Sequence, residues 1–168
     1  MGEPDFEPEV KRAEVAAAGG GDLPYLASGE HKDEAMETMA KGLAVVVRRL
    51  YEKGMIGGII GMGGTGGTSI ATTAMRVLPV GVPKVMVSTV AGGDVSAYAG
   101  TKDITFIPSI VDVAGVNSIS RTIFANAAGA IAGMVKLDAP QTEEERPLVT
   151  ASMFGNTTTC VERARGVV

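Results

Sequence analysis

Apolar side chains recur every three or four residues between positions 32 and 53 of the chain. This spacing brings them to one face of a helix and predicts an amphipathic helix that packs against a core. Gly54 follows directly and is expected to end the helix. The apolar positions that define it are Met36, Met39, Leu43, Val46, Val47 and Leu50.

Beyond this helix, short apolar runs alternate with helical segments. The candidate strands cover residues 56–60, 84–90, 103–107 and 148–152. The candidate helices run from near Gly67 until before Pro79, from a cap at Asn117 or Ser118 to Val135, and over residues 155–165. The alternation predicts an α/β fold, a Rossmann-like three-layer sandwich with a mostly parallel sheet. Because the chain opens with a helix and stops within another, we expect a partner segment or subunit to complete the sheet.

The first 31 residues are rich in glycine, proline and glutamate and show no apolar periodicity. We therefore interpret residues 1–31 as a flexible arm or linker, with a short helix over residues 8–18 as the alternative. Residues 32–168 then form the Rossmann-like nucleotide-binding domain.

Composition narrows the classes of function. The formal net charge of −4 disfavours a nucleic-acid partner, because such domains carry a clustered excess of Lys and Arg. Cys160 is the single cysteine, which excludes a disulfide within the chain and fits a reducing compartment. The sequence shows neither a secretory signal nor an apolar stretch long enough for a membrane span. We expect a cytoplasmic protein with no membrane partner.

A glycine-rich segment lies between the strand 56–60 and the helix that follows it. In an α/β sheet this position brings a helix N-terminus, with its free N–H groups and partial positive charge, to a bound phosphate. The candidate phosphate-binding residues are Gly61, Gly63, Gly64, Thr65, Gly66, Gly67 and Thr68. Gly61, Gly63 and Gly66 match the GxGxxG pattern, but the Gly-Lys-Ser/Thr ending of a P-loop is absent. The alternative is that these glycines only allow a helix to pack closely on a strand.

A second group of candidates follows the strand 84–90. Ser88, Thr89, Gly92 and Asp94 are expected at the same edge of the sheet, beside Gly93. Ser88-Thr89-Val90 stands where a dinucleotide-binding fold carries an acidic residue, so a dehydrogenase is disfavoured. Asp94 is expected either to hold Mg²⁺ or a ribose hydroxyl, or simply to cap a helix.

Other candidates are weaker. The turn 155–159, with Thr157, Thr158 and Thr159, is either a second anion-binding turn or an ordinary helix cap. Cys160 is interpreted as a small buried residue, and His31 as a solvated side chain without a catalytic partner. Small residues at one helix surface suit close packing on the sheet or against another subunit, and we expect a homodimer; they are Ala125, Ala128, Gly129, Ala132 and Gly133.

The glycine segment 61–68, together with residues 75–91, resembles the Tm-one-like ATP-binding domain family. The resemblance continues through residues 103–105, 112–117, 131–134 and 153–155, and so covers most of residues 32–162. This family includes the tomato mosaic virus resistance protein and uncharacterised bacterial and fungal homologues. The resemblance implies a Rossmann-like ATP-binding layer, Mg²⁺ and dimers, with this chain matching the first half of the family architecture.

The residues and the resemblance together predict a nucleotide-binding domain that is regulatory or of unknown cellular role, with ATP as the ligand. One alternative is an enzyme that acts on ATP or on a phosphorylated small metabolite, although no general base can be named. Another alternative is a structural fragment that serves assembly and whose glycine turn stays empty. The sequence identifies no protein partner.

Overall fold

The computed structural model describes residues 6–113, 115–137 and 149–167. The chain divides into two compact units, residues 1–138 and residues 139–168. The first unit contains the helices α1 (Arg12–Ala18), α2 (Leu23–Leu26), α3 (Lys32–Glu52), α4 (Thr65–Met75), α5 (Ser96–Ala99) and α6 (Ser118–Lys136). Its strands are β1 (Ile59–Gly63), β2 (Lys84–Ser88) and β3 (Thr105–Pro108), and the second unit contains α7 (Thr158–Arg165).

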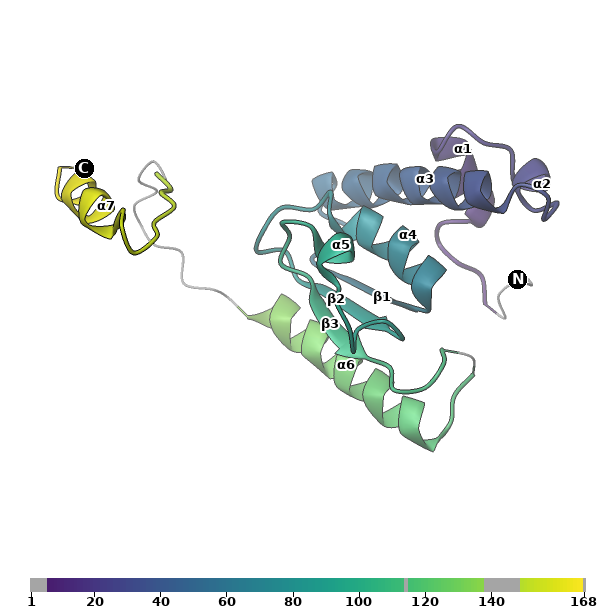
Figure 1. The fold of residues 1–168 in the computed structure, drawn as a ribbon. Helices are drawn as coiled ribbons and strands as arrows, with labels where there is room; N and C mark the ends of the chain where they lie inside the picture. The colour runs from purple at the N-terminus through teal and green to yellow at the C-terminus, as the bar shows by residue number, and fades with distance from the viewer. Residues whose placement is uncertain (1–5, 114, 138–148, 168) are drawn as a thin grey trace. The chain divides into compact units, whose positions relative to one another are not determined.

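The three strands form a parallel sheet in the order β1-β2-β3. Helices α3 and α4 cover one face of this sheet and α6 covers the other, which gives three layers (Figure 1). The predicted α/β class and the parallel, Rossmann-like layering are thus confirmed. All five residues of β2 are buried, as expected of a central strand that has a helix on each face.

Two apolar clusters hold the layers together. Val47 of α3 packs with Ala74 and Leu78 on the α4 side of the sheet. Val85 and Val87 of β2 pack with Ala127 of α6 on the other side, where the partly buried Ile107, Ile123, Phe124 and Ile131 surround them. Val85 and Val87 share the face toward α6 because residues two apart along a strand point to the same side.

The amino-terminal segment matches the alternative of a short helix over residues 8–18 rather than the preferred arm or linker, since α1 covers Arg12–Ala18. Helix α1 packs against α3 and buries Val15 and Ala16. The backbones meet closely, since a Cβ on Gly42 would lie 1.8 Å from the carbonyl oxygen of Val15. Small residues make this contact possible, and they leave no apolar periodicity in the sequence that could have indicated a packed helix.

Most predicted elements are present with small shifts in their ends. Helix α4 begins at Thr65, before the expected start near Gly67, and β2 ends at Ser88 rather than at residue 90. Asn117 caps α6 as predicted: its side chain accepts hydrogen bonds from the N–H groups of Ile119 and Ser120. The short helix α5 was not expected.

The predicted strand 148–152 is wrong where the structure describes it. Residues 149–152 carry no strand pairing, and Leu148 lies outside the described residues. An apolar run becomes a strand only when a neighbouring strand supplies its backbone hydrogen bonds, and composition alone cannot reveal that neighbour. The last predicted helix is present as α7, three residues shorter than expected at its start.

Candidate functional site

The carboxyl ends of the three strands lie side by side. Gly63 pairs with Ser88, and Ser88 pairs with Pro108, so the connections that leave β1, β2 and β3 begin at one edge of the sheet. In open parallel sheets this edge is the usual place for a bound ligand. The sequence-predicted residues of the first two connections are therefore brought together there.

Helix α4 begins immediately after β1 and presents its N-terminus at this edge. Gly64 is the N-cap, and the N–H of Thr68 donates to the Gly64 carbonyl oxygen at 2.8 Å as the first bond of the helix. The N–H groups of Thr65, Gly66 and Gly67 precede that bond and have no acceptor inside the helix. They carry the positive end of the helix dipole, so this turn is suited to an anion.

The glycines of this segment differ in what the fold requires of them. A Cβ on Gly63 would lie 3.0 Å from the Gly67 Cα atom, and one on Gly61 would lie 3.0 Å from the Ala71 Cβ atom, so a side chain at either position would force its neighbours to shift by a few tenths of an ångström. A Cβ on Gly64 would meet only Thr89 Oγ1, at 3.6 Å. On Gly67 it would lie 3.8 Å from the Met62 carbonyl oxygen.

Packing among the described residues thus leaves Gly64 and Gly67 unexplained. Neither has a positive φ, and Gly67 weakens the first turn of a helix by about 1 kcal/mol relative to alanine. Gly66 is an intermediate case, because the added Cβ would meet the flexible end of Met36 at 3.0 Å. Glycine at 64 and 67 keeps the free N–H groups accessible, which is the property that a phosphate-binding turn needs.

Buried hydroxyl groups connect the three loops. Thr68 Oγ1 and Ser88 Oγ lie 2.6 Å apart, and the Ser109 N–H donates to the Ser88 carbonyl oxygen at 3.0 Å. Thr68 and Ser88 are fully buried, and Ser109 is 1% exposed. The hydroxyls of Thr68 and Ser88 therefore position the loops and do not face solvent, where a ligand would lie.

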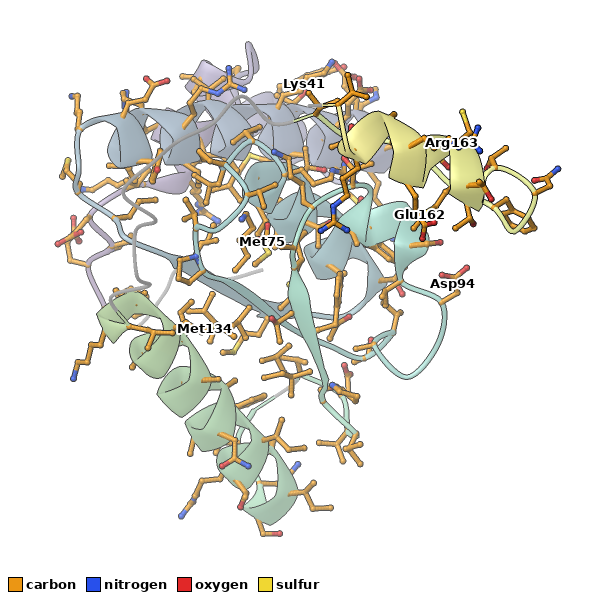
Figure 2. All side chains as sticks on the ribbon, turned by 90° about the vertical axis from the view of Figure 1, so that its left-hand side faces the viewer. Lys41, Met75, Asp94, Met134, Glu162 and Arg163 are labelled. Atoms are coloured by element: carbon orange, nitrogen blue, oxygen red, sulfur yellow. The ribbon has the colours of Figure 1, made fainter. Side chains whose placement is uncertain are left out.

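The second loop contributes groups that are accessible. Thr89 is exposed, and its N–H donates to the Gly63 carbonyl oxygen at 3.3 Å, which ties this loop to the end of β1. Gly92 is also exposed, and a Cβ there would meet nothing within 4 Å among the described residues. The Asp94 side chain points outward from this connection, whereas Met75 lies inside the layers (Figure 2).

Asp94 holds the turn that precedes α5, whose N-cap is Val95. The Asp94 Oδ1 accepts a hydrogen bond from the Ser96 N–H at 2.9 Å, and this bond lowers the pKa of the Asp94 carboxyl group. Asp94 thus lies one residue before the N-cap, and its bond to the Ser96 N–H is an Asx turn rather than the expected helix cap. Among the described residues, no group of three His, Cys, Asp or Glu side chains is arranged to hold a metal ion.

The cations between residues 54 and 100 are engaged elsewhere. Arg76 lies at the far end of α4 and donates to the carbonyl oxygens of Ala97 and Tyr98. Lys84 is the first residue of β2, at the opposite end from Ser88. Its buried ammonium group donates to Asp103 Oδ1 at 2.8 Å and to two carbonyl oxygens. This stretch therefore offers an anion neutral donors only.

Sequence reasoning missed the third loop, which follows β3. Ser109 Oγ donates to the Val111 carbonyl oxygen at 2.6 Å, and Ile110 between them has a φ of 63°. Ile110 is the only residue other than glycine with a positive φ in the described part of the chain. No local signal could have revealed it, because isoleucine strongly disfavours this conformation.

The weaker candidates behave as ordinary surface residues. Thr157 occupies the N-cap position of α7 but makes no side-chain cap bond to the helix. Its Oγ1 instead accepts from the Phe154 N–H at 2.9 Å and holds the preceding turn. Cys160 is exposed, contrary to the expected burial. The His31 ring stacks on Tyr25 with 4.7 Å between centroids. No helix in the described residues combines the length and apolar character that a membrane span requires.

Comparison with known proteins shows which family the chain belongs to. Residues 1–140 match the model of an uncharacterised protein family, the UPF0261 N-terminal domain. The chain belongs to this family. It is 50% identical over 165 residues to a UPF0261 protein of Clostridium tetani, covering 98% of this chain and 41% of the relative. A Rhizobium meliloti UPF0261 protein is 43% identical over 153 residues, covering 91% and 37%.

The chain is also similar to a plant protein. The tomato protein named ToMV resistance protein Tm-1 is 39% identical over 137 residues, which cover 78% of this chain and 18% of the tomato protein. The resemblance to Tm-one-like proteins is therefore confirmed at the level of the family. The chain spans about two fifths of the bacterial relatives described above, at 41% and 37% of their lengths.

Proposed function

We propose that this chain is a nucleotide-binding domain that holds the phosphates of ATP on the first turn of α4. The observation that carries the proposal is the presence of glycine at positions 64 and 67, where packing does not require it. Both residues flank N–H groups that have no acceptor inside the helix. A side chain at either position would narrow the approach to those groups.

Each residue of the site has a distinct part in the proposal. The N–H groups of Thr65, Gly66 and Gly67 contact phosphate oxygens, and the exposed hydroxyls of Thr65 and Thr89 add donors. Gly61, Gly63, Thr68 and Ser88 give the loop its shape through packing and buried hydrogen bonds. Gly92 lets the ligand lie close to the second loop. Asp94 fixes that loop through its bond with Ser96.

Because the hydrogen-bond donors at this edge are neutral, the negative charge of the ligand must be neutralised by another group. A triphosphate carries several negative charges, while residues 54–100 offer no free cation to this edge. Mg²⁺ bound to the phosphates would neutralise part of that charge. We therefore propose that ATP binds as its magnesium complex, in a cytoplasmic protein whose role is regulatory or still to be found.

Calorimetric titration with ATP, with and without Mg²⁺, tests the proposal. We expect saturable binding by the chain that is lost in Gly64→Val, because the introduced isopropyl group would stand over the free N–H groups. Gly155→Val, a change in open space before α7, is the matched control and should bind like the original chain. Thermal unfolding of both variants checks that the fold is retained.

Two outcomes would contradict the proposal. One is the absence of ATP binding by the unchanged chain in the presence of Mg²⁺. The other is unchanged binding by Gly64→Val, which would favour the alternative of an assembly fragment whose glycine turn is empty. Release of ADP or phosphate during the titration would instead favour the enzyme alternative.

A further inference from the structure

The loop after β3 holds an isoleucine in a conformation that its side chain opposes. Ile110 has a φ of 63°, and its side chain is 74% exposed. A β-branched residue is especially disfavoured there, because both Cγ branches crowd the neighbouring backbone. An apolar side chain exposed to water in a strained conformation stabilises nothing within the described unit.

The strain is maintained by the buried hydrogen bonds around Ser109. The Ser109 N–H is held by the Ser88 carbonyl oxygen, and its hydroxyl by the Val111 carbonyl oxygen. Ser88 in turn contacts Thr68 in the first turn of α4. The backbone on both sides of Ile110 is therefore attached to the same network that shapes the glycine loop. Strained residues that a surrounding network enforces tend to occur at ligand sites.

The chemistry of this edge divides between its loops. The first two loops present N–H groups and hydroxyls beside Gly64 and Thr89. The connection from β3 to α6 and the first turn of α6 present apolar side chains, since Ile110 and Val116 of the connection are 74% and 65% exposed and Ile119 of α6 is 49% exposed. Neighbouring strands are about 4.8 Å apart, so β1 and β3 are about 10 Å apart. A nucleotide has the same division, with charged phosphates at one end and a flat base at the other.

We propose that Ile110 is the residue against which the base of the bound nucleotide packs. This inference rests on the proposed function, since it takes the phosphates to lie on α4. Ile110 then determines the preference for a ligand with a planar apolar group over inorganic phosphate chains. The strain and the exposure of Ile110 destabilise the free protein, and only a base that covers the side chain offsets this cost.

Two substitutions separate binding from strain. Ile110→Gly removes the apolar surface, and Ile110→Asn replaces it with a polar side chain that tolerates a positive φ. The matched control is Val80→Gly, because Val80 is also β-branched and 70% exposed but precedes β2 at the opposite edge of the sheet. Calorimetry is carried out with Mg-ATP and with magnesium tripolyphosphate. Tripolyphosphate reports binding of the phosphate chain alone, and the difference between the two ligands reports the contribution of the nucleoside.

We expect both Ile110 variants to bind Mg-ATP about tenfold more weakly than the original chain, with tripolyphosphate affinity unchanged within about twofold. Val80→Gly should leave both affinities unchanged. Ile110→Asn should also raise the thermal unfolding midpoint by about 2–4 °C, because it relieves the strain.

Several results would overturn the inference. Unchanged ATP affinity in both variants would show that Ile110 does not contact the base. An equal loss for ATP and tripolyphosphate would assign the effect to the shape of the phosphate loop. An unfolding midpoint of Ile110→Asn below that of the original chain would remove the premise of strain. Binding of neither ligand by the unchanged chain would refute the proposed function itself, whereas binding of both by every variant would leave that function intact.

Discussion

Thr68 Oγ1 and Ser88 Oγ lie 2.6 Å apart in the interior, and neither side chain is exposed. Thr68 belongs to the first turn of α4, and Ser88 ends β2. The Ser88 hydroxyl oxygen also accepts from the Val90 N–H at 3.2 Å. This contact fixes the glycine loop relative to the next strand, and it explains why a hydroxyl is present on both residues although neither faces solvent.

Removing either hydroxyl should destabilise the fold. Thr68→Val and Ser88→Ala are each expected to lower the free energy of unfolding by about 1–3 kcal/mol, because each leaves a buried polar group without its partner. The double variant should lose less than the sum, with a coupling of at least about 0.5 kcal/mol. Urea denaturation of the four proteins measures this coupling. Strictly additive losses would mean that the two hydroxyls act independently.

The buried Lys84 makes the fold sensitive to acid through Asp103. Partial burial acts to raise the pKa of the Asp103 carboxyl group, but hydrogen bonds from Lys84 and from the Gly81 N–H outweigh it and hold this pKa below the ordinary value of 3.8. Because the pKa of Asp103 is lowered in the fold, its carboxylate stabilises the fold at pH values above the ordinary pKa. That contribution is lost as the pH falls through the lower pKa of the folded state.

Asp103→Asn should therefore lower stability near neutral pH and reduce its decline below pH 3.8. We expect a loss of about 2 kcal/mol, less than for a fully enclosed ion pair, because water reaches the carboxylate. The control is Glu52→Gln, which removes an exposed carboxylate and should leave the stability near neutral pH unchanged. Denaturation at a series of pH values gives both curves, and parallel curves for Asp103→Asn and the original chain would contradict the assignment.

The contact between α1 and α3 predicts that Gly42 cannot accept even a methyl group. In Gly42→Ala the new Cβ would lie 1.8 Å from the Val15 carbonyl oxygen, so α1 must move away. We expect faster hydrogen exchange in residues 12–18 and a loss of about 1–3 kcal/mol. Gly129→Ala in α6 makes the same change in open space and should instead stabilise by up to about 1 kcal/mol. If hydrogen exchange in residues 12–18 were unchanged in Gly42→Ala, the interpretation of residues 1–31 as an arm or linker would be favoured again.

The small residues of α6 bear on the expected homodimer. Ala125, Ala128 and Gly129 are exposed, as are Ala132 and Gly133. Light scattering should give the mass of a dimer, and Ala128→Glu should shift it toward a monomer by placing a charge on the smooth surface. Ser118→Glu, at the start of the same helix, is the control. A monomer mass for the unchanged chain would rule out the homodimer at the concentrations measured.

The sequence predicted the elements whose cause is local. The apolar spacing of α3, the cap at Asn117 and the buried run of β2 each follow from nearby residues, and the structure has them all. What it missed depends on distant contacts. Helix α1 was expected only as an alternative, and its packing depends on backbone contact at Gly42, whereas Ile110 is strained by bonds that reach Ser88. The wrong strand at residues 149–152 had suitable residues but no neighbour.

Within the candidate site, sequence reasoning found the residues but could not divide their roles. Gly63 and Gly64 are adjacent and identical, yet only at Gly63 would a side chain force its neighbours to shift. Thr65 and Thr68 are of one type, yet one is exposed and the other fully buried. Such differences arise from the helix turn and the sheet beside it, which a linear pattern does not contain.

The enclosure of Lys84 has a practical consequence. Its side chain is completely shielded from solvent and its ammonium group donates to three oxygen atoms, so an amine-reactive reagent cannot reach it while these contacts are intact. Lys41 on α3, with a side chain 64% exposed, remains open to the same reagent. Modification of Lys84 therefore requires its contacts with Pro79, Val82 and Asp103 to open. The extent of its labelling, measured by mass spectrometry, reports the fraction of molecules in which these contacts have opened, even in a complex mixture of proteins.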